Sequence, residues 1–198
     1  MNYIYSRANN VWLTMTESIH ENFVLLHKPE ENTMIHIRKA VLADIDSIMR
    51  CYDIARQTMR ASGNLNQWNN GYPSRQHVAR DIADGISYVG VDEDENIVMV
   101  FAFFIGADPT YAVIENGAWL NNHKYGTIHR LASDARYHGI LRLCVDFCST
   151  MIDNIRLDTH ADNHIMQHAA EKLGFKPCGI IYCQDGTPRI AYQRYLGR

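Results

Sequence analysis

The segment that most constrains the fold of this chain runs from residue 125 to residue 151. It begins as an alternating strand, "YGTIHRLAS", continues through a polar turn that contains Gly139, and ends in the apolar-periodic run "ILRLCVDFC". That periodicity predicts an amphipathic helix whose inner face packs on the strand. The predicted inner face comprises Leu141, Cys144, Val145 and Cys148. The turn leaves backbone N–H groups at the positive end of the helix dipole, which favours an anion as ligand.

The pattern from residue 34 onward alternates between strand and helix periodicity. Ser74 is a helix N-cap signal, and Gly85 and Gly174 are helix stop signals. The predicted strands are 34–40, 86–91, 97–106, 125–133, 154–160, 178–183 and 189–195, and the predicted helices are 42–60, 74–84, 140–151 and 162–173. The order β-α-α-β-β-β-α-β-α-β-β predicts an α/β protein with one mixed central β-sheet flanked by helices. We expect 34–40 to be a short edge strand.

Residues 1–33 differ from the rest because they are polar and only weakly periodic. Three interpretations of these residues remain open: an extra helix, a mobile arm, or a chain start that has been assigned too far upstream. The predicted organisation is therefore an N-terminal extension of uncertain structure, 1–33, followed by one domain, 34–198.

Composition limits the partners of the chain. The net charge of −3 disfavours an extended nucleic-acid groove, and no apolar run approaches the roughly 18 residues of a membrane helix. The first 23 residues lack the basic start and unbroken apolar stretch of a secretion signal. The five cysteines form no CxxC pair, which favours buried free thiols. We expect a cytoplasmic protein without nucleic-acid or membrane partners.

Two motifs carry a family resemblance: "SDARYHGIL" before the helix, and "NxxMxxxxEKLGF" after the next strand. In this order they resemble the GNAT superfamily of acyl-CoA-dependent N-acyltransferases, over about residues 34–198. The family's pyrophosphate loop has the form (Arg/Gln)-x-x-Gly-x-(Gly/Ala). Arg136 and Gly139 match it, and Leu141 departs from it. Backbone N–H groups hold the pyrophosphate, so Leu141 is expected to alter the fit of the loop without abolishing it.

The resemblance implies acetyl-CoA as cosubstrate and a set of residues that contact it. Backbone N–H groups of Leu131, Ala132 or Ser133 would polarise the thioester carbonyl, typically at a β-bulge. Asn163 would lie near the pantetheine arm, and it is also a simple N-cap candidate. The implied contacts are Leu131, Ala132, Ser133, Arg136, Tyr137, His138, Gly139, Ile140, Leu141 and Asn163.

The implied reaction is attack of a neutral amine on the thioester, which requires a general base. His129 on one strand, and Asp158 and His160 on the next, are the candidates, although each is also compatible with a structural role. Asp158 and His160 are two residues apart and therefore face the same side of their strand. The family's usual acid is a Tyr, and Ala170 occupies its position here. Tyr182 or Cys183 could replace it, or the thiolate could leave unassisted.

The loop between the first two helices is the expected acceptor site, for a small-molecule or peptide amine. Gln67, Trp68 and Tyr72 would line it, although packing roles for the aromatic rings remain open. Glu115 would attract the substrate ammonium, and Arg130, which never deprotonates, would hold a substrate carboxylate.

Three alternatives remain beside this interpretation. His164 and His168 are four residues apart, with His160 and Asp158 nearby, but "HIMQH" lacks the Glu of HExxH, so no metal is predicted. A non-catalytic acyl-CoA-binding or regulatory protein on the same fold is the second function. A homodimer through the C-terminal strands is possible by analogy.

Overall fold

The structure is a computed structural model that describes residues 3–6, 11–14, 23–24 and 34–197. Its core is one mixed sheet with the strand order β3-β4-β5-β6-β7-β8-β10-β9, in which only the β7–β8 pair is parallel. The strands are β4 (Ile35–Lys39), β5 (Ser87–Val91), β6 (Ile97–Ile105), β7 (Gly126–Ser133), β8 (Asn154–Thr159), β9 (Lys176–Tyr182) and β10 (Pro188–Tyr195). The helices are α1 (Ile45–Ala61), α2 (Arg75–Ala83), α3 (Ile140–Ser149) and α4 (His164–Lys172), with short 3-10 turns η1 (Leu42–Asp44) and η2 (Pro109–Tyr111). The predicted class and element order are confirmed.

The first 33 residues contribute three short strands within the described part. β1 (Tyr3–Ser6) and β2 (Val11–Thr14) pair with each other in a separate two-stranded sheet. β3 (Phe23–Val24) pairs with β4. The prediction that 34–40 is an edge strand was therefore wrong, because a two-residue strand extends the sheet beyond it. The remaining expectations for this extension fall on residues outside the described ranges.

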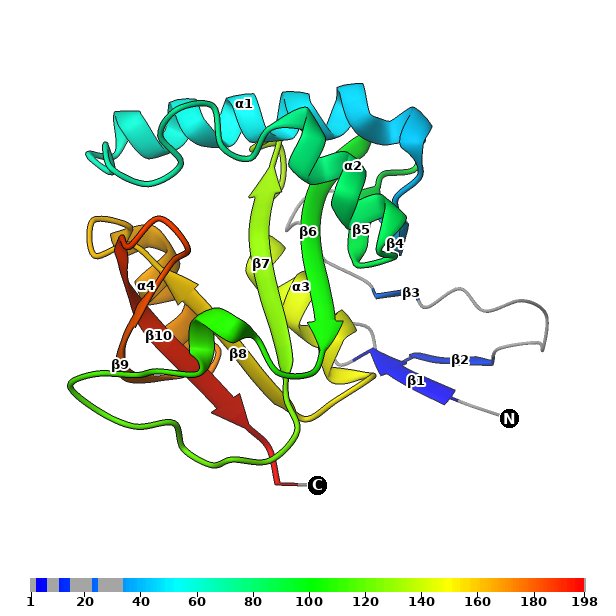
Figure 1. Ribbon diagram of the computed structural model, residues 1–198. Helices are drawn as coiled ribbons and strands as arrows, with labels where there is room; N and C mark the ends of the chain where they lie inside the picture. Colours follow the sequence, from blue (N-terminus) through cyan, green and yellow to red (C-terminus); the bar gives the residue numbers. More distant parts are fainter. Residues whose placement is uncertain (1–2, 7–10, 15–22, 25–33, 198) are drawn as a thin grey trace.

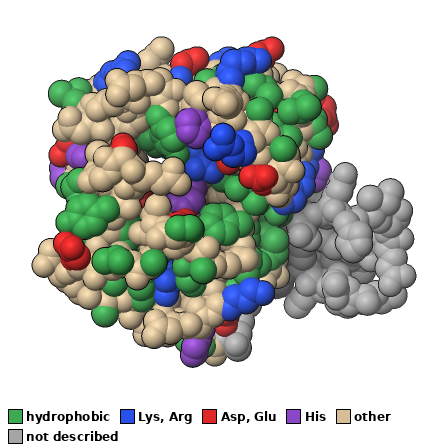
Figure 2. Space-filling view, in the orientation of Figure 1, with side chains coloured by type: hydrophobic (Ala, Val, Ile, Leu, Met, Phe, Trp, Pro, Cys, Tyr) green, Lys and Arg blue, Asp and Glu red, His purple; other side chains and the backbone are tan. Residues whose placement is uncertain are grey.

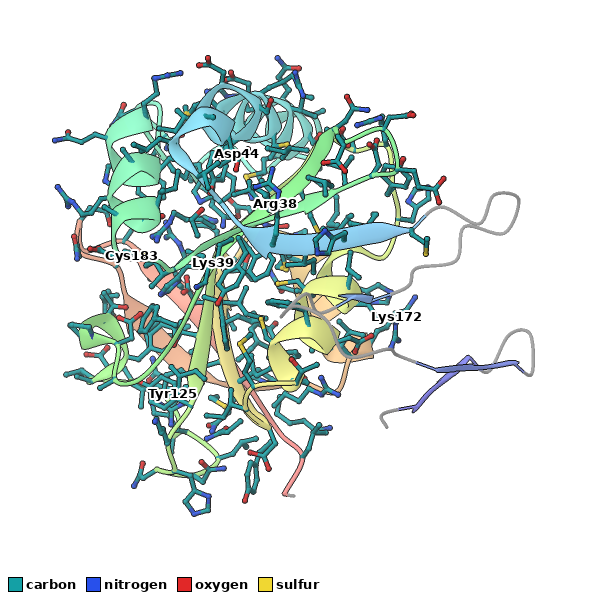
Figure 3. The ribbon with its side chains drawn as sticks, turned by 90° about the vertical axis from the view of Figure 1, so that its right-hand side faces the viewer. Arg38, Lys39, Asp44, Tyr125, Lys172 and Cys183 are labelled. Atoms are coloured by element: carbon teal, nitrogen blue, oxygen red, sulfur yellow. The ribbon has the colours of Figure 1, made fainter. Side chains whose placement is uncertain are left out.

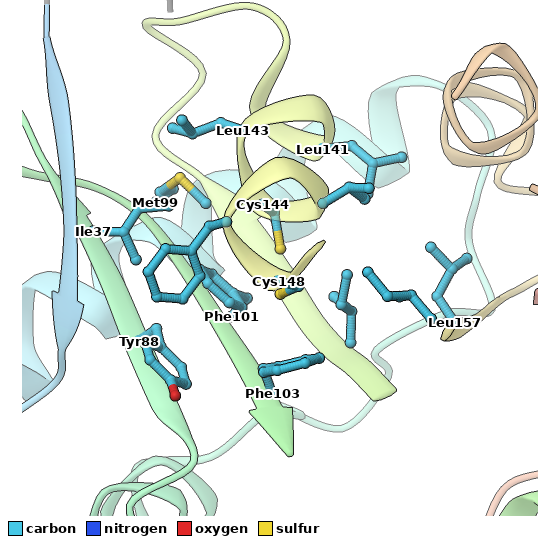
Figure 4. Packing of buried hydrophobic residues seen from close by; sticks show 14 of the residues in the cluster. Ile37, Tyr88, Met99, Phe101, Phe103, Leu141, Leu143, Cys144, Cys148 and Leu157 are labelled. Atoms are coloured by element: carbon cyan, nitrogen blue, oxygen red, sulfur yellow. The ribbon is translucent and has the colours of Figure 1, made fainter. Parts of the chain in front are cut away.

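The helices cover the two faces of the sheet separately (Figure 1). α1 and α2 pack on one face, where Ile48, Tyr52 and Val78 are buried against β5 and β6. α3 and α4 pack on the other face. Figure 4 shows Leu143, Cys144 and Cys148 of α3 turned toward the aromatic side chains of β5 and β6. The predicted inner face of α3 is confirmed, because all four of its residues are buried.

Local signals fix where the elements begin and end. The Ser74 hydroxyl accepts a hydrogen bond from the His77 N–H at the start of α2, and Gly174, with φ +85°, ends α4, as predicted. Figure 3 shows Arg38 beside Asp44, where β4 leads into α1. Both guanidinium Nη atoms of Arg38 contact the carboxylate, at 2.7 and 3.0 Å. This ion pair ties β4 to the start of the first long helix.

Two irregularities of β7 create the space for a site. β7 pairs with β8 only through Ile128, opposite Leu157, and beyond that point the two strands diverge. On its other side the register with β6 shifts between the Val100–Ala132 and Ala102–His129 pairs, so β7 holds one extra residue there. Arg130 lies in this bulge with φ +54°. The family resemblance implied a bulge next to Leu131, and the structure has one at Arg130.

Candidate active site

Two adjoining cavities lie where β7 and β8 diverge, one of about 800 Å³ and one of about 430 Å³. The larger cavity opens between α1, α2 and the β9–β10 turn, and Figure 2 shows a hollow below α1 with histidine, basic and acidic side chains beside it. The smaller cavity lies between α1, α4 and the turn before α3. Residues that line both cavities are Met59, Leu131, Leu141, Asn163 and Met166. The two spaces therefore adjoin at these residues, so that a long ligand in one would place its reactive end beside the other.

The smaller cavity contains most of the residues that the family resemblance implied for acetyl-CoA. Those that line it are Leu131, Ala132, Ser133, Tyr137, His138, Gly139, Ile140, Leu141 and Asn163. Gly139 is the N-cap of α3 and has φ +76°, a conformation that L side chains rarely adopt. The backbone N–H groups that follow it lie at the positive end of the α3 dipole. The geometry is that of an anion site.

Arg136 is the predicted loop residue that does not line the smaller cavity. Its Nε donates to Asp134 at 2.6 Å, and its Nη1 donates to the buried Asp92 at 3.1 Å. Asp92 belongs to the turn between β5 and β6, so Arg136 anchors the loop before α3 to that turn. Its side chain therefore holds the loop in place, while the loop's backbone faces the cavity.

Leu141, the departure from the family pattern, is accommodated by packing. Its side chain is 7% exposed and belongs to the core cluster beneath α3. The branched side chain points into the core at the junction of the two cavities, so it does not fill the turn where Gly139 lies.

A cluster of four ionisable side chains borders the larger cavity: His129, Asp108 and Asp158, which line it, and the buried Tyr111. The Nε2 atom of His129 is 2.6 Å from Asp108 Oδ2, and its Nδ1 atom is 3.5 Å from Asp158 Oδ1. The Tyr111 hydroxyl donates to Asp158 Oδ1 at 2.7 Å. His129 therefore lies between two carboxylates, and a hydroxyl orients the second of them.

The protonation states of this cluster follow from its contacts. Burial raises the pKa of Asp108, but hydrogen bonds from His129 and Thr110 outweigh it and hold that pKa below its ordinary value. Burial, together with the neighbouring Asp158 carboxylate, raises the pKa of Tyr111 well above its ordinary value. Asp108 is thus ionised and Tyr111 is a permanent donor at neutral pH.

Sequence reasoning missed Asp108 and Tyr111. The run "DPTY" carries a local signal, since Asp108 caps η2 by accepting hydrogen bonds from the N–H and hydroxyl of Thr110 at 2.8 and 2.7 Å. That signal predicts a turn. Contact with His129, which lies 21 residues later, depends on the course of the whole 106–125 loop.

Arg156 holds that loop against β8. Its guanidinium carbon lies 3.9 Å from the Trp119 ring centre and 3.8 Å from the Tyr125 ring centre. The Tyr125 hydroxyl accepts a hydrogen bond from the Asp108 N–H, and Trp119 Nε1 donates to the Tyr111 carbonyl. Arg156 therefore supports both loop residues of the His129 cluster: it holds Asp108 through the Tyr125 ring and Tyr111 through the Trp119 ring.

His160, the third candidate base, lies apart from His129 and Asp158. Its Nδ1 atom accepts a hydrogen bond from the Asp162 N–H at 3.1 Å and is 3.4 Å from Asp162 Oδ2. It lines neither cavity. The structure thus brings two of the three predicted catalytic residues together.

Four of the five predicted acceptor residues line the larger cavity: Gln67, Trp68, Tyr72 and Arg130. Gln67 Oε1 accepts hydrogen bonds from Asn64 and from Asn163, which joins the loop to the start of α4. Glu115 lines neither cavity. Its carboxylate accepts a hydrogen bond from the Tyr182 hydroxyl at 2.9 Å.

The guanidinium of Arg130 already has a carboxylate partner. Its Nε and Nη2 atoms donate to the two oxygens of Asp81 at 3.0 and 2.9 Å, and Nη1 donates to the Tyr72 hydroxyl at 3.2 Å. This bidentate pair neutralises both charges. The arrangement suits a structural strut between α2 and β7.

The position of the family's usual acid offers no proton donor. Ala170 is fully buried in the core cluster. Of the two suggested replacements, Tyr182 does not line a cavity, whereas Cys183 lines the larger one. Burial, followed by the nearby Asp158 charge, raises the pKa of the Cys183 thiol, so it is protonated at neutral pH.

In residues 34–197 and the three short N-terminal strands, no three His, Cys, Asp or Glu side chains are grouped as a metal site would require. In the same part of the chain, no helix is long and apolar enough to cross a membrane.

Solved structures resemble this one over most of its length. A GNAT-family acetyltransferase from Streptococcus agalactiae is 32% identical, with a TM-score of 0.76 over 89% of this chain and 100% of that one. An acetyltransferase from Staphylococcus aureus is 23% identical, with a TM-score of 0.58 over 81% and 98%. A GNAT-superfamily phosphinothricin acetyltransferase from Sinorhizobium meliloti, in complex with AcCoA, is 18% identical, with a TM-score of 0.54 over 82% and 89%. No protein-family model matches the chain, and no curated protein matches it.

Proposed function

The chain belongs to the GNAT family of acetyltransferases, and from that premise we propose that it transfers the acetyl group of acetyl-CoA to a primary amine. The observation that carries the proposal is that the two cavities adjoin and share five lining residues. One cavity ends at the N-terminus of α3, and the other contains the Asp108–His129–Asp158 cluster. A cosubstrate with an anionic middle and a reactive end fits this arrangement.

Acetyl-CoA is the cosubstrate, and its pyrophosphate would lie against the backbone N–H groups after Gly139. The presence of AcCoA in the Sinorhizobium meliloti structure supports this assignment. Asn163, whose Oδ1 caps α4 by accepting from the Met166 N–H at 3.1 Å, lies at the junction of the cavities. The pantetheine arm would pass there, toward the bulge of β7.

His129 is the proposed base. Its shorter contact, to Asp108, keeps the proton on Nε2, which leaves the Nδ1 lone pair to accept a proton from the amine. Asp158 then faces the imidazolium that forms, as a carboxylate does in other His–Asp pairs. Asp108 acts through His129 and is a positioning residue. His160 stays a weaker candidate.

The acetyl transfer does not require a separate general acid for the coenzyme A thiolate. The amine nitrogen bonds to the acetyl carbon, the C–S bond breaks, and the amine proton passes through His129 to the coenzyme A sulfur. Backbone N–H groups of Leu131 to Ser133 would stabilise the oxyanion, a contribution of about 3 kcal/mol for each donor. Since a thiolate is a tolerable leaving group near neutral pH, Ala170 is compatible with turnover.

The alternative function is binding of acetyl-CoA without transfer. The buried Ala170, where family members often have the acid, favours this second candidate. Four expectations stay predictions: a cytoplasmic location, a small-molecule or peptide acceptor, the absence of nucleic-acid partners, and a homodimer through β10.

Calorimetric titration of acetyl-CoA, followed by thiol-release assays with a panel of amines, tests the proposal. We expect micromolar binding to the wild type and about a tenfold or greater loss with Gly139→Asp, which adds a negative charge at the dipole. Gly85→Asp is the matched control, because Gly85 also has positive φ but lies outside both cavities. Binding without thiol release would favour the alternative, and absence of binding would reject both.

A further inference from the structure

Arg189 is a buried guanidinium in the wall of the larger cavity with no carboxylate in contact. The residue is 8% exposed, and its Nη1 atom donates to the neighbouring Pro188 carbonyl at 2.8 Å. Among the residues that the structure describes, no Asp or Glu oxygen lies within 4.0 Å of its nitrogens. Burying an unpaired charge is costly, so this side chain requires an anion when the cavity is closed by a ligand.

The nearest acid in sequence does not fill that role. Asp185, in the β9–β10 turn, is exposed, and its Oδ1 atom accepts hydrogen bonds from the N–H and hydroxyl of Thr187. It acts on Arg189 only at a longer distance. The carboxylate is thus used to close its own turn.

The sheet register puts Arg189 on the same face as Asp158. Ala191 of β10 pairs directly with Asp158 of β8, so their side chains share a face. Arg189 is two residues before Ala191 and therefore faces the same way, about 7 Å along the strand. Ala191, directly opposite Asp158, adds only a methyl group to this face. Arg189 and the His129 cluster therefore line the same cavity from two sides, as the two charged ends of a zwitterion require.

The other arginines of the cavity do not offer the same contact. Arg130 is paired with Asp81 in a bidentate contact. Arg80, on α2, is exposed at the rim, where water solvates its charge. Arg189 is the cavity-lining arginine that is both buried and without an acidic partner in the described part of the chain.

We propose that the acceptor is a free amino acid, whose carboxylate pairs with Arg189 while its amino group faces His129 and Asp158. The inference rests on the proposed function and adds the substrate class. A guanidinium binds a carboxylate through two parallel hydrogen bonds, a contact that a neutral amide cannot reproduce. Arg189 is therefore the residue that distinguishes an amino acid from a peptide N-terminus or a simple amine.

The test compares each proteinogenic amino acid with its own carboxamide in a thiol-release assay with acetyl-CoA. We expect at least one amino acid to be acetylated, with a kcat/KM about tenfold to a hundredfold above that of its amide. Arg189→Met should bring this ratio close to one while the Kd for acetyl-CoA stays unchanged. Arg80→Met, the matched control, should leave the ratio as in the wild type.

If Arg189→Met does not fold, Arg189→Lys provides the second variant. It keeps the charge but loses the forked geometry, so the ratio should fall without reaching one. Three outcomes would overturn the inference and leave the acetyltransferase function standing. They are equal rates with an amino acid and its amide, a ratio that the Arg189 variants leave unchanged, and acetylation only of amines that lack a carboxylate. Absence of acetyl-CoA binding, or binding without acetylation of any amine, would overturn both.

Discussion

The two cavities of this protein are built in different ways. The smaller one is formed mainly by one continuous segment, residues 131–142, and by one face of α4. The larger one combines the loop after α1, the α2 helix, the 106–125 loop, the middle of β7 and the β9–β10 turn. In the first, backbone groups and apolar side chains define the surface. In the second, charged side chains define it by pairing with one another.

This difference determines how each cavity tolerates substitution. A surface of backbone N–H groups survives many changes of side chain, provided that the turn keeps its shape. A surface of paired charges does not, because the loss of one partner leaves the other buried without compensation. We therefore expect the largest effects of single substitutions in the larger cavity.

His129→Gln should have the largest effect on catalysis. The amide retains the size of the ring but cannot accept the amine proton, so kcat should fall about a hundredfold to ten-thousandfold. The Kd for acetyl-CoA should stay the same, because His129 does not line the smaller cavity. Steady-state kinetics and calorimetry check both parts.

His160→Gln is the matched control for that prediction. His129 lies in β7 and His160 follows the end of β8, but His160 contacts Asp162 and lines neither cavity. Its kcat should remain within about threefold of the wild type. A large loss in this variant, with normal activity of His129→Gln, would transfer the base role to His160.

Arg130→Met and Arg136→Met compare equivalent ion pairs in the two regions. The Arg130 side chain is 17% exposed, and its removal leaves Asp81 unpaired. The free energy of unfolding should therefore fall by about 2–3 kcal/mol. The Arg136 side chain is 46% exposed, and its buried partner Asp92 keeps hydrogen bonds from the N–H groups of Asp94 and Asn96, so the loss of Arg136 should cost less than about 1 kcal/mol. Urea unfolding measures both, and equal losses would remove the distinction between the cavities.

Arg156→Met tests whether the position of the 106–125 loop depends on the contacts of the Arg156 guanidinium with the Trp119 and Tyr125 rings. Without that contact, Tyr125 and Trp119 hold Asp108 and Tyr111 less firmly, and kcat should fall about tenfold with little change in KM. Arg156→Lys, which keeps the charge, should recover part of the loss. A change in thermal stability with unaltered kcat would show that the contact is only structural.

The same contrast explains how much could be predicted from the sequence. The turn at Gly139 before α3 and the end of α4 at Gly174 are local features that the sequence predicted correctly, and the bulge near Leu131 was implied by the family resemblance. Asp108 was missed because it is brought to His129 by a loop whose course depends on the Arg156 contacts. Glu115 was assigned to the acceptor, but the 106–125 loop turns it toward Tyr182.

The smallest expected effect concerns the acid stability of the larger cavity. The pKa of Asp108 is lower in the folded protein than its ordinary value near 3.8, because hydrogen bonds from His129 and Thr110 outweigh the effect of burial. The ionised carboxylate therefore contributes stability above about pH 4, and this contribution is lost as the pH falls through the lowered pKa. Urea unfolding should thus show a steeper loss between pH 5 and pH 3 for the wild type than for Asp108→Asn. A slope for Asp108→Asn equal to that of the wild type would contradict this prediction, because it would mean that the Asp108 contacts in the larger cavity contribute nothing to the loss of stability in acid.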